Sequence, residues 1–113
     1  MHLSDFDLGW VVGIIEGEGC FVRYQDKRRP TTWSIKIQVE STDHDVILKL
    51  KQLLGGNIWE SNYASKYKRF PDAKPSWRWA ITNRKLGVPL LQMLQPNMSV
   101  RRQKQIQLLL DIA

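Results

Sequence analysis

The chain has 113 residues, a formal net charge of +6 and one cysteine. This length suits a single small domain, and a lone cysteine excludes an internal disulfide. No apolar run reaches the roughly 18 residues of a membrane-spanning helix, and the first residues lack a secretory signal, so we expect an intracellular protein outside the membrane. The excess of lysine and arginine suits a polyanion such as nucleic acid or an anionic membrane surface. No residue spacing indicates a zinc site or a small-molecule cofactor.

The first predicted element is an apolar helix from residue 4 or 5 to Glu18, ended by Gly19. Residues without a side chain recur every four positions on one face of this helix: Gly9, Gly13 and Gly17. A glycine inside a helix costs about 1 kcal/mol relative to alanine, so the glycine stripe indicates close approach of another backbone. Glu16 and Glu18 lie at the negative end of the helix dipole, where a cation would relieve the unfavourable charge.

Two strands are predicted next, over residues 20–26 and 33–41, with a polar loop at residues 26–32 between them. The second strand shows the clearest alternation, with one apolar and one polar set: Trp33, Ile35, Ile37 and Val39, then Ser34, Lys36, Gln38 and Glu40. A period of two places one face against a core and leaves the other in water.

The remaining elements are predicted in this order: a helix capped by Ser41 or Thr42 and stopped by Gly55, a strand at residues 57–63, a long basic loop at 64–75, a strand at 76–82, a helix at 84–95, and a last helix at 100–112 capped by Ser99. In the strand at 76–82, the tryptophans are expected to point inward and Ser76, Arg78 and Ala80 outward. Residues 1–113 are therefore predicted to form one α+β domain of order αββαββαα. Its four-stranded antiparallel sheet would carry helices on one face.

Residues 11–19 read V-V-G-I-I-E-G-E-G and resemble the nine-residue motif of the LAGLIDADG homing endonucleases, position by position. Glycine stands at the third and ninth places and an acidic residue at the sixth and eighth. Two later stretches support the resemblance, I-K-I-Q-V-E-S-T-D and L-Q-P-N-M-S-V-R-R-Q-K-Q. The resemblance covers residues 5 to about 112 and implies one half of a saddle-shaped homodimer. It also implies the activity of a metal-dependent, sequence-specific double-strand DNA endonuclease.

The resemblance places a metal site at the end of the motif helix. Glu18, at the eighth motif position, would bind Mg²⁺ together with the Gly19 backbone carbonyl. Mn²⁺ is expected to substitute, and Ca²⁺ to bind without turnover. Glu16 lies about 200° away round the helix and is expected to be structural. The family more often has aspartate at the eighth position.

The resemblance implies two further catalytic residues. Ser41 stands where the family often has a glutamine that orders water, although Ser41 can instead cap the following helix. The basic residue expected before the last helix is Arg102, by its match to R-Q-K-Q, with Arg101 and Lys104 as alternatives. The family usually has lysine there. Because arginine stays protonated, it would stabilise charge rather than activate water.

The polar sheet face and the basic loops form the predicted DNA-binding surface. Phosphate contacts give affinity, and base contacts give sequence selection. Gln38 and Arg78 lie at strand centres and suit adenine and guanine edges in the major groove. Other residues share this face or the loops: Tyr24, Arg28, Arg29, Lys36, Glu40, Trp59, Ser61, Lys66, Lys68 and Arg69.

A single motif implies a homodimer through the glycine stripe, a roughly palindromic target and breaks with 3′ overhangs. The chain begins with Met1 and shows no flanking splicing domain, so we expect a free-standing protein rather than one embedded in an intein, with one half of a fused two-motif enzyme as the alternative. The departures at Ser41 and Arg102 leave open a slow enzyme or a non-catalytic nucleic-acid-binding protein on the same fold, the latter either an intron-splicing maturase or a transcription regulator. A protein-interaction module is a third hypothesis, which the basic loops disfavour.

Overall fold

Helices and strands follow one another in the predicted αββαββαα order in the computed structural model, which describes residues 2–61 and 75–113. The elements are α1 (Asp5–Glu18), β1 (Gly19–Asp26), β2 (Arg29–Ser41), α2 (His44–Leu54), β3 (Asn57–Ser61), β4 (Ser76–Ile81), α4 (Arg84–Leu94), the 3-10 helix η1 (Gln95–Asn97) and α5 (Val100–Ile112). The predicted α+β class is confirmed.

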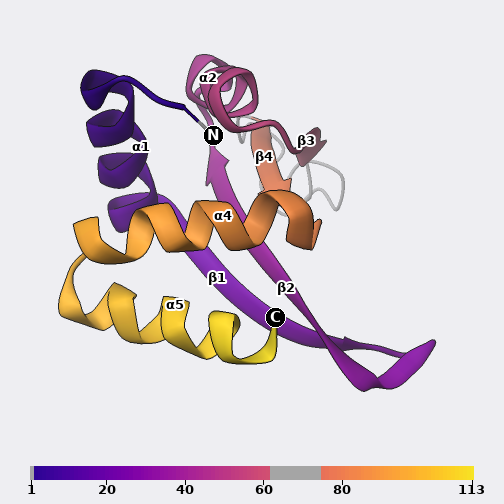
Figure 1. Ribbon diagram of the computed structural model, residues 1–113. Coiled ribbons are helices and arrows are strands. Elements are labelled where there is room, and N and C mark those ends of the chain that lie inside the picture. The colour runs from indigo at the N-terminus through magenta and orange to yellow at the C-terminus, as the bar shows by residue number, and fades with distance from the viewer. Residues whose placement is uncertain (1, 62–74) are drawn as a thin grey trace.

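The four strands form one antiparallel sheet in the order β1-β2-β4-β3. β2 pairs with β1 along most of its length and with β4 from Ile37 to Ser41. Figure 1 shows the helices gathered on one side of the sheet and the β1–β2 hairpin extending past them. The predicted sheet with helices on one face is therefore confirmed.

The hydrophobic core lies between the sheet and the helices. Ile35, Ile37 and Val39 of β2 are buried, as their alternation predicted. Trp79 is fully buried, and its Nε1 atom donates to the Gly55 carbonyl at 2.8 Å. The helices contribute Val11, Ile15, Ile47, Leu50, Leu90, Leu91, Leu94 and Ile106. Burying one such aliphatic side chain stabilises the fold by about 1.5–3 kcal/mol. A slip of β2 by one residue would expose all of its buried side chains, so this energy fixes the register of β2.

The first hairpin is tighter than predicted. The expected polar loop at residues 26–32 is wrong, because β1 continues to Asp26 and β2 already begins at Arg29. The Asp26 side chain closes the turn by accepting from the Arg28 backbone N–H at 2.9 Å. Pro30 is tolerated because β4 pairs with β2 only from Ile37 onward, which leaves one side of β2 unpaired near the turn.

Two local predictions on β2 and α2 need correction. The N-cap of α2 is Asp43, whose side chain accepts from the Asp45 N–H, rather than Ser41 or Thr42. Trp33 was expected on the buried face but is 38% exposed, because it lies on the hairpin away from the main core. The Arg23 guanidinium covers its ring instead, with Cζ 5.5 Å from the ring centroid.

β3 is described from Asn57 to Ser61, and the rest of the strand predicted at residues 57–63 lies outside the described residues. α4 begins at Arg84 as predicted, with Asn83 as its cap and Pro89 inside the helix. Among the residues that the structure describes, no helix is both long and apolar enough to cross a membrane.

Candidate metal site and nucleic-acid interface

The end of α1 presents a carboxylate to solvent. Glu18 is the last residue of α1 and is exposed, and Gly19 is already the first residue of β1. A Cβ atom at Gly19 would lie 2.5 Å from the Ile15 carbonyl oxygen and 2.7 Å from its Cγ2 atom. Only glycine fits here, so the last glycine of the motif lets the chain pass from helix to strand without a loop. This junction sets the direction in which Glu18 leaves the helix.

We expect Gly19→Ala to destabilise the protein. The added methyl group collides with backbone as well as side chain, and overpacking of this kind costs about 1–3 kcal/mol. The measurement is urea unfolding, followed by circular dichroism at one protein concentration. An unchanged midpoint would show that the helix–strand junction tolerates a side chain.

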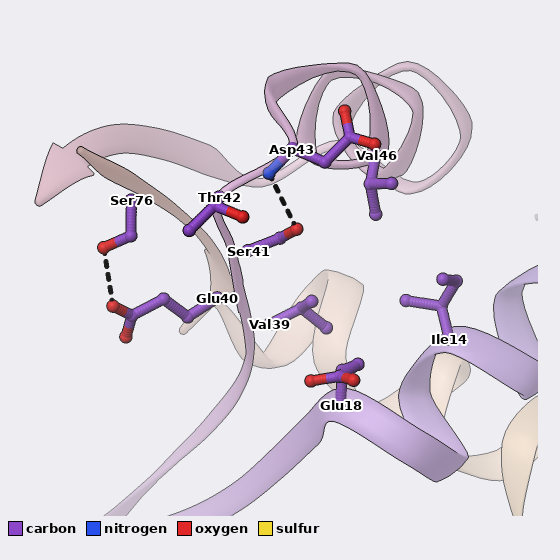
Figure 2. Close-up of a pocket in the computed structure, with 9 residues that line it drawn as sticks. All are labelled: Ile14, Glu18, Val39, Glu40, Ser41, Thr42, Asp43, Val46 and Ser76. Atoms are coloured by element: carbon purple, nitrogen blue, oxygen red, sulfur yellow. Dashed lines mark hydrogen bonds between the residues drawn. The ribbon is translucent and has the colours of Figure 1, made fainter. Parts of the chain in front are cut away.

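Glu18 and Ser41 line the same pocket, of about 500 Å³. Figure 2 shows Glu18 on one side of it and Ser41 and Asp43 on the other. The Ser41 Oγ atom accepts from the Asp43 backbone N–H at 3.0 Å. The remaining lining residues are Ile14, Val39, Glu40, Thr42, Val46 and Ser76. The structure thus brings Glu18 and Ser41 to one pocket, with Ser41 supporting the turn before α2.

The donor chemistry around Glu18 fits a hard cation bound jointly with a substrate. Within residues 2–61 and 75–113, no group of three His, Cys, Asp or Glu side chains could hold a metal by itself. Mg²⁺ commonly binds one or two carboxylates and completes its shell with water and phosphate oxygens. An exposed carboxylate such as Glu18 suits that mode. The Gly19 carbonyl accepts from Arg102 Nη2 at 2.8 Å, which leaves one of its two lone pairs for a metal.

Arg102 lies against the C-terminal end of α1 and is only 7% exposed. Its Nε and Nη2 atoms donate to the Glu16 carbonyl at 3.3 and 3.1 Å, and Nη2 also donates to the Gly19 carbonyl at 2.8 Å. Nη1 donates to Gln105 Oε1 at 2.9 Å. Arg102 is therefore close to the end of the motif helix, and each of its guanidinium nitrogens has a protein partner.

Glu16 faces the N-terminus of α5. Its carboxylate accepts from the Ser99 backbone N–H at 2.6 Å and from the Ser99 hydroxyl at 3.0 Å. The Ser99 N–H, its hydroxyl and the charges of Arg102 and Arg101 hold the pKa of Glu16 below its ordinary value, and partial burial opposes them. These contacts support a structural role for Glu16. Arg101 and Lys104, the alternative cations, are exposed.

The glycine stripe of α1 is bare in the single chain. Gly9, Gly13 and Gly17 are exposed, and an added Cβ atom at any of them would meet nothing within 4 Å. Gly13 lies about 160–200° round the helix from the buried Val11 and Ile15. Phe6, on the same outer side, is 76% exposed. A helix with apolar residues on all sides is normally buried by other protein surfaces on all sides.

The face of the sheet away from the core carries the predicted base-contacting residues. Strand register places them together: Tyr24 with Ser34, Lys36 with Val22, Gln38 with Ala80, and Glu40 and Trp59 with Arg78. Ser61 pairs with Ser76 at the end of the same face. The alternation in the sequence thus located this set of side chains correctly. Ala80 is on this face as predicted, although only 2% exposed.

Glu40, Arg78 and Ser76 form a hydrogen-bonded group on this face. Arg78 Nη2 donates to Glu40 Oε2 at 2.9 Å, and the Ser76 hydroxyl donates to Glu40 Oε1 at 2.8 Å. Arg78 Nε and Gln38 Oε1 are buried without a hydrogen-bond partner in the described parts of the chain. Leaving such an atom without a partner lowers the free energy of unfolding by about 1–3 kcal/mol. Ser76 was not among the predicted site residues, although its alternation with Arg78 indicated this face.

We expect Glu40→Gln to remove part of the pH dependence of stability. The hydrogen bond from Arg78, and then that from Ser76, holds the pKa of Glu40 below its ordinary 4.5. Stability from these contacts is complete above pH 4.5 and is lost as pH falls through the lower folded-state pKa. The difference in melting temperature between wild type and variant should therefore disappear in acid. At neutral pH the difference should be small, because the Arg78–Glu40 ion pair is partly exposed. A gap that stays constant into acid would contradict this expectation.

The basic residues predicted to contact phosphate fall in two regions. Arg28 is in the β1–β2 turn with its side chain 92% exposed, and Arg29 begins β2. Lys66, Lys68 and Arg69 lie outside the described residues.

The sequence matches no protein-family model, and no curated protein is similar to it in sequence. Solved structures are similar to it in fold. An archaeal intron-encoded homing endonuclease complexed with DNA matches 90% of this chain and 64% of its own, with a TM-score of 0.69 and 21% identity. The homing endonuclease I-CvuI, in complex with a DNA target, matches 95% of this chain and 66% of its own, with a TM-score of 0.72 and 17% identity.

The LAGLIDADG homing endonuclease I-LtrWI, bound to its target DNA, matches 98% of this chain and 38% of its own, with a TM-score of 0.64 and 17% identity. These three structures, each of a homing endonuclease, share the fold of this chain. The chain has the LAGLIDADG fold, as the motif at residues 11–19 indicated. The chain spans less than two thirds of the length of the archaeal enzyme and of I-CvuI.

Proposed function

We propose that the protein is a metal-dependent, sequence-specific DNA endonuclease that cuts both strands of a roughly palindromic target as a homodimer. The observation that carries the proposal is the exposed carboxylate of Glu18 at the end of a helix whose outer side is bare glycine. The LAGLIDADG fold supports it, because proteins with this fold have been solved with target DNA bound. As the resemblance implies, the breaks would leave 3′ overhangs.

A second copy of the chain is the proposed occupant of the glycine stripe. Two such helices can approach backbone to backbone, because Gly9, Gly13 and Gly17 present no side chain. Two-fold symmetry would place the two Glu18 carboxylates side by side, and a two-fold protein favours a target with matching half-sites. One chain offers one Glu18, and each of the two DNA strands needs to be cut.

In the proposed site, Glu18 and the Gly19 carbonyl would hold Mg²⁺, which would supply its charge to the scissile phosphates. Bound there, Mg²⁺ would neutralise phosphate charge and help to activate water. Ser41 keeps its hydroxyl proton free to donate to water, because its contact with Asp43 uses Oγ as an acceptor. Arg102 donates to the backbone carbonyl of Gly19, the residue that follows Glu18. Structures of I-CvuI with DNA in the presence of Mg and of Ca support a divalent metal with this fold.

The polar sheet face is the proposed DNA-reading surface. Gln38 and Arg78 place an amide and a guanidinium group on this face, and these groups suit adenine and guanine edges. Tyr24, Lys36, Glu40, Trp59 and Ser61 complete this face. Arg28 and Arg29 on the hairpin, together with Lys66, Lys68 and Arg69, are the proposed phosphate contacts.

One observation favours a second candidate, a non-catalytic nucleic-acid-binding protein such as a maturase or a transcription regulator. Arg102 already has protein partners at every guanidinium nitrogen, and Ser41 already supports a turn. A binder with this fold would keep the sheet face and the dimer but would not cut DNA.

A cleavage assay on a library of palindromic duplexes distinguishes the two. The protein is incubated with the library in Mg²⁺, cut ends are sequenced, and bound duplexes are recovered separately in Ca²⁺. An endonuclease gives one family of cut sites that coincides with the bound sites. Tight, selective binding without any nick would instead establish the non-catalytic alternative.

A further inference from the structure

The C-terminal end of α1 adjoins the N-terminal end of α5. Neither helix carries in that turn the charged residues that would stabilise its own end. α1 has no basic residue in its last turn and carries Glu16 and Glu18 there, whereas α5 has no acidic residue in its first turn. A helix C-terminus favours a cation, and a helix N-terminus favours an anion. The required charges must therefore come from another element.

Each of the two helices supplies the charge that the other lacks. Arg102 of α5 donates to the Glu16 and Gly19 carbonyls at the end of α1. In return, the Glu16 carboxylate accepts from the N–H and the hydroxyl of Ser99, the N-cap of α5. Glu16 and Arg102 also form an ion pair at 3.5 Å. The two helix ends are joined by reciprocal caps.

Glu18 lies between Glu16 and Gly19, the two residues whose carbonyls accept hydrogen bonds from Arg102. The guanidinium bridges Glu16 and Gly19, and so fixes the backbone on both sides of Glu18. Arg102 is 7% exposed and its last nitrogen is bound to Gln105. To contact a DNA phosphate, Arg102 would have to give up hydrogen bonds in a buried place, which is costly for a charged group.

We infer that Arg102 is a positioning residue, which orients Glu18 by clamping the end of α1 and does not contact the substrate. Glu16 supports the same contact from α1, through its hydrogen bonds to Ser99. The inference rests on the proposed function, and it differs from the charge-stabilising role that the resemblance implied for Arg102. Loss of a group that orients a metal ligand typically lowers metal affinity or activity by about 10- to 100-fold.

The test makes two measurements on Arg102→Gln with a cognate duplex from the library assay. Binding is followed by fluorescence anisotropy in Ca²⁺ across a salt series. Removing a side chain that neutralises a DNA phosphate lowers the slope of log affinity against log salt by about one for each subunit. For a positioning residue we expect an unchanged slope. We also expect an increase of about 10- to 100-fold in the Mg²⁺ concentration that gives half-maximal cleavage.

Two comparison variants test whether the hydrogen-bonding geometry of Arg102 or its positive charge causes the effect. Lys51→Gln removes one positive charge from an exposed position on α2 and should leave the Mg²⁺ requirement unchanged. Arg102→Lys keeps the charge but cannot span two carbonyls with a planar fork, so it should share the defect. If circular dichroism shows that Arg102→Gln does not fold, Glu16→Gln takes its place. That variant keeps an acceptor for Ser99, and we expect a smaller rise in the Mg²⁺ requirement with the same slope.

A shallower salt slope with an unchanged Mg²⁺ requirement would overturn the positioning role, and so would full rescue by Arg102→Lys. Either result would leave the endonuclease function standing. A wild-type protein that neither binds nor cuts any duplex is a different outcome, because it would overturn the proposed function itself and the inference with it.

Discussion

Glu18→Gln should abolish DNA cleavage and leave DNA binding as tight as, or tighter than, in the wild type. The substitution keeps the size of the side chain and removes the charge that would hold Mg²⁺, so cleavage should fall by more than about 100-fold. Binding should not suffer, because two carboxylates that meet near phosphates repel them. The fold should be unaffected, since Glu18 is exposed.

The measurement is single-turnover cleavage of the cognate duplex, together with anisotropy binding in Ca²⁺. Glu60→Gln is the matched control, since it removes an exposed carboxylate from β3 and should cut normally. If Glu18→Gln cuts at the wild-type rate, the metal site has been assigned to the wrong residue.

Gly13→Leu should split the proposed homodimer without unfolding the chain. Nothing lies within 4 Å of an added Cβ atom at Gly13, so a single chain has room for the leucine and gains helix propensity. Between two helices in backbone contact, the same side chain overpacks the interface by about 1–3 kcal/mol in each copy. Dimer affinity should therefore fall by about 30-fold or more.

Sedimentation velocity distinguishes monomer from dimer by the sedimentation coefficient, and cleavage of the palindromic duplex should disappear with the dimer. Gln52→Leu places the same side chain on the exposed surface of α2 and should stay dimeric. An unchanged sedimentation coefficient for Gly13→Leu would exclude the glycine stripe as the interface.

The sequence was most informative where a pattern is local and periodic. Alternation in β2 located both the buried Ile37 and the polar Gln38, because a strand has a strict period of two. The spacing of the glycines predicted the bare face of α1, because residues four apart share one side of a helix. The final Gly19 of the motif ended the helix as expected.

Contacts between distant residues could not be predicted in this way. The link between Glu16 and Ser99 joins residues 83 positions apart, and no spacing rule connects them. The helix dipole indicated that a cation was needed near Glu16, but not that Arg102 would be bound there through backbone carbonyls. The hairpin differs from its prediction because proline commonly indicates a loop, whereas the unpaired side of a strand also accepts it, as at Pro30.

The hairpin of β1 and β2 extends past the helices, and none of residues 29–34 is fully buried (Figure 1). Substitutions at surface positions usually change the free energy of unfolding by less than about 0.5 kcal/mol. New side chains can therefore be introduced on the β1–β2 hairpin with little effect on folding. Under the proposed function, single mutations on the hairpin would change the preferred target while the core that supports Glu18 stays unchanged. The hairpin is therefore the natural place to begin redesign of sequence preference.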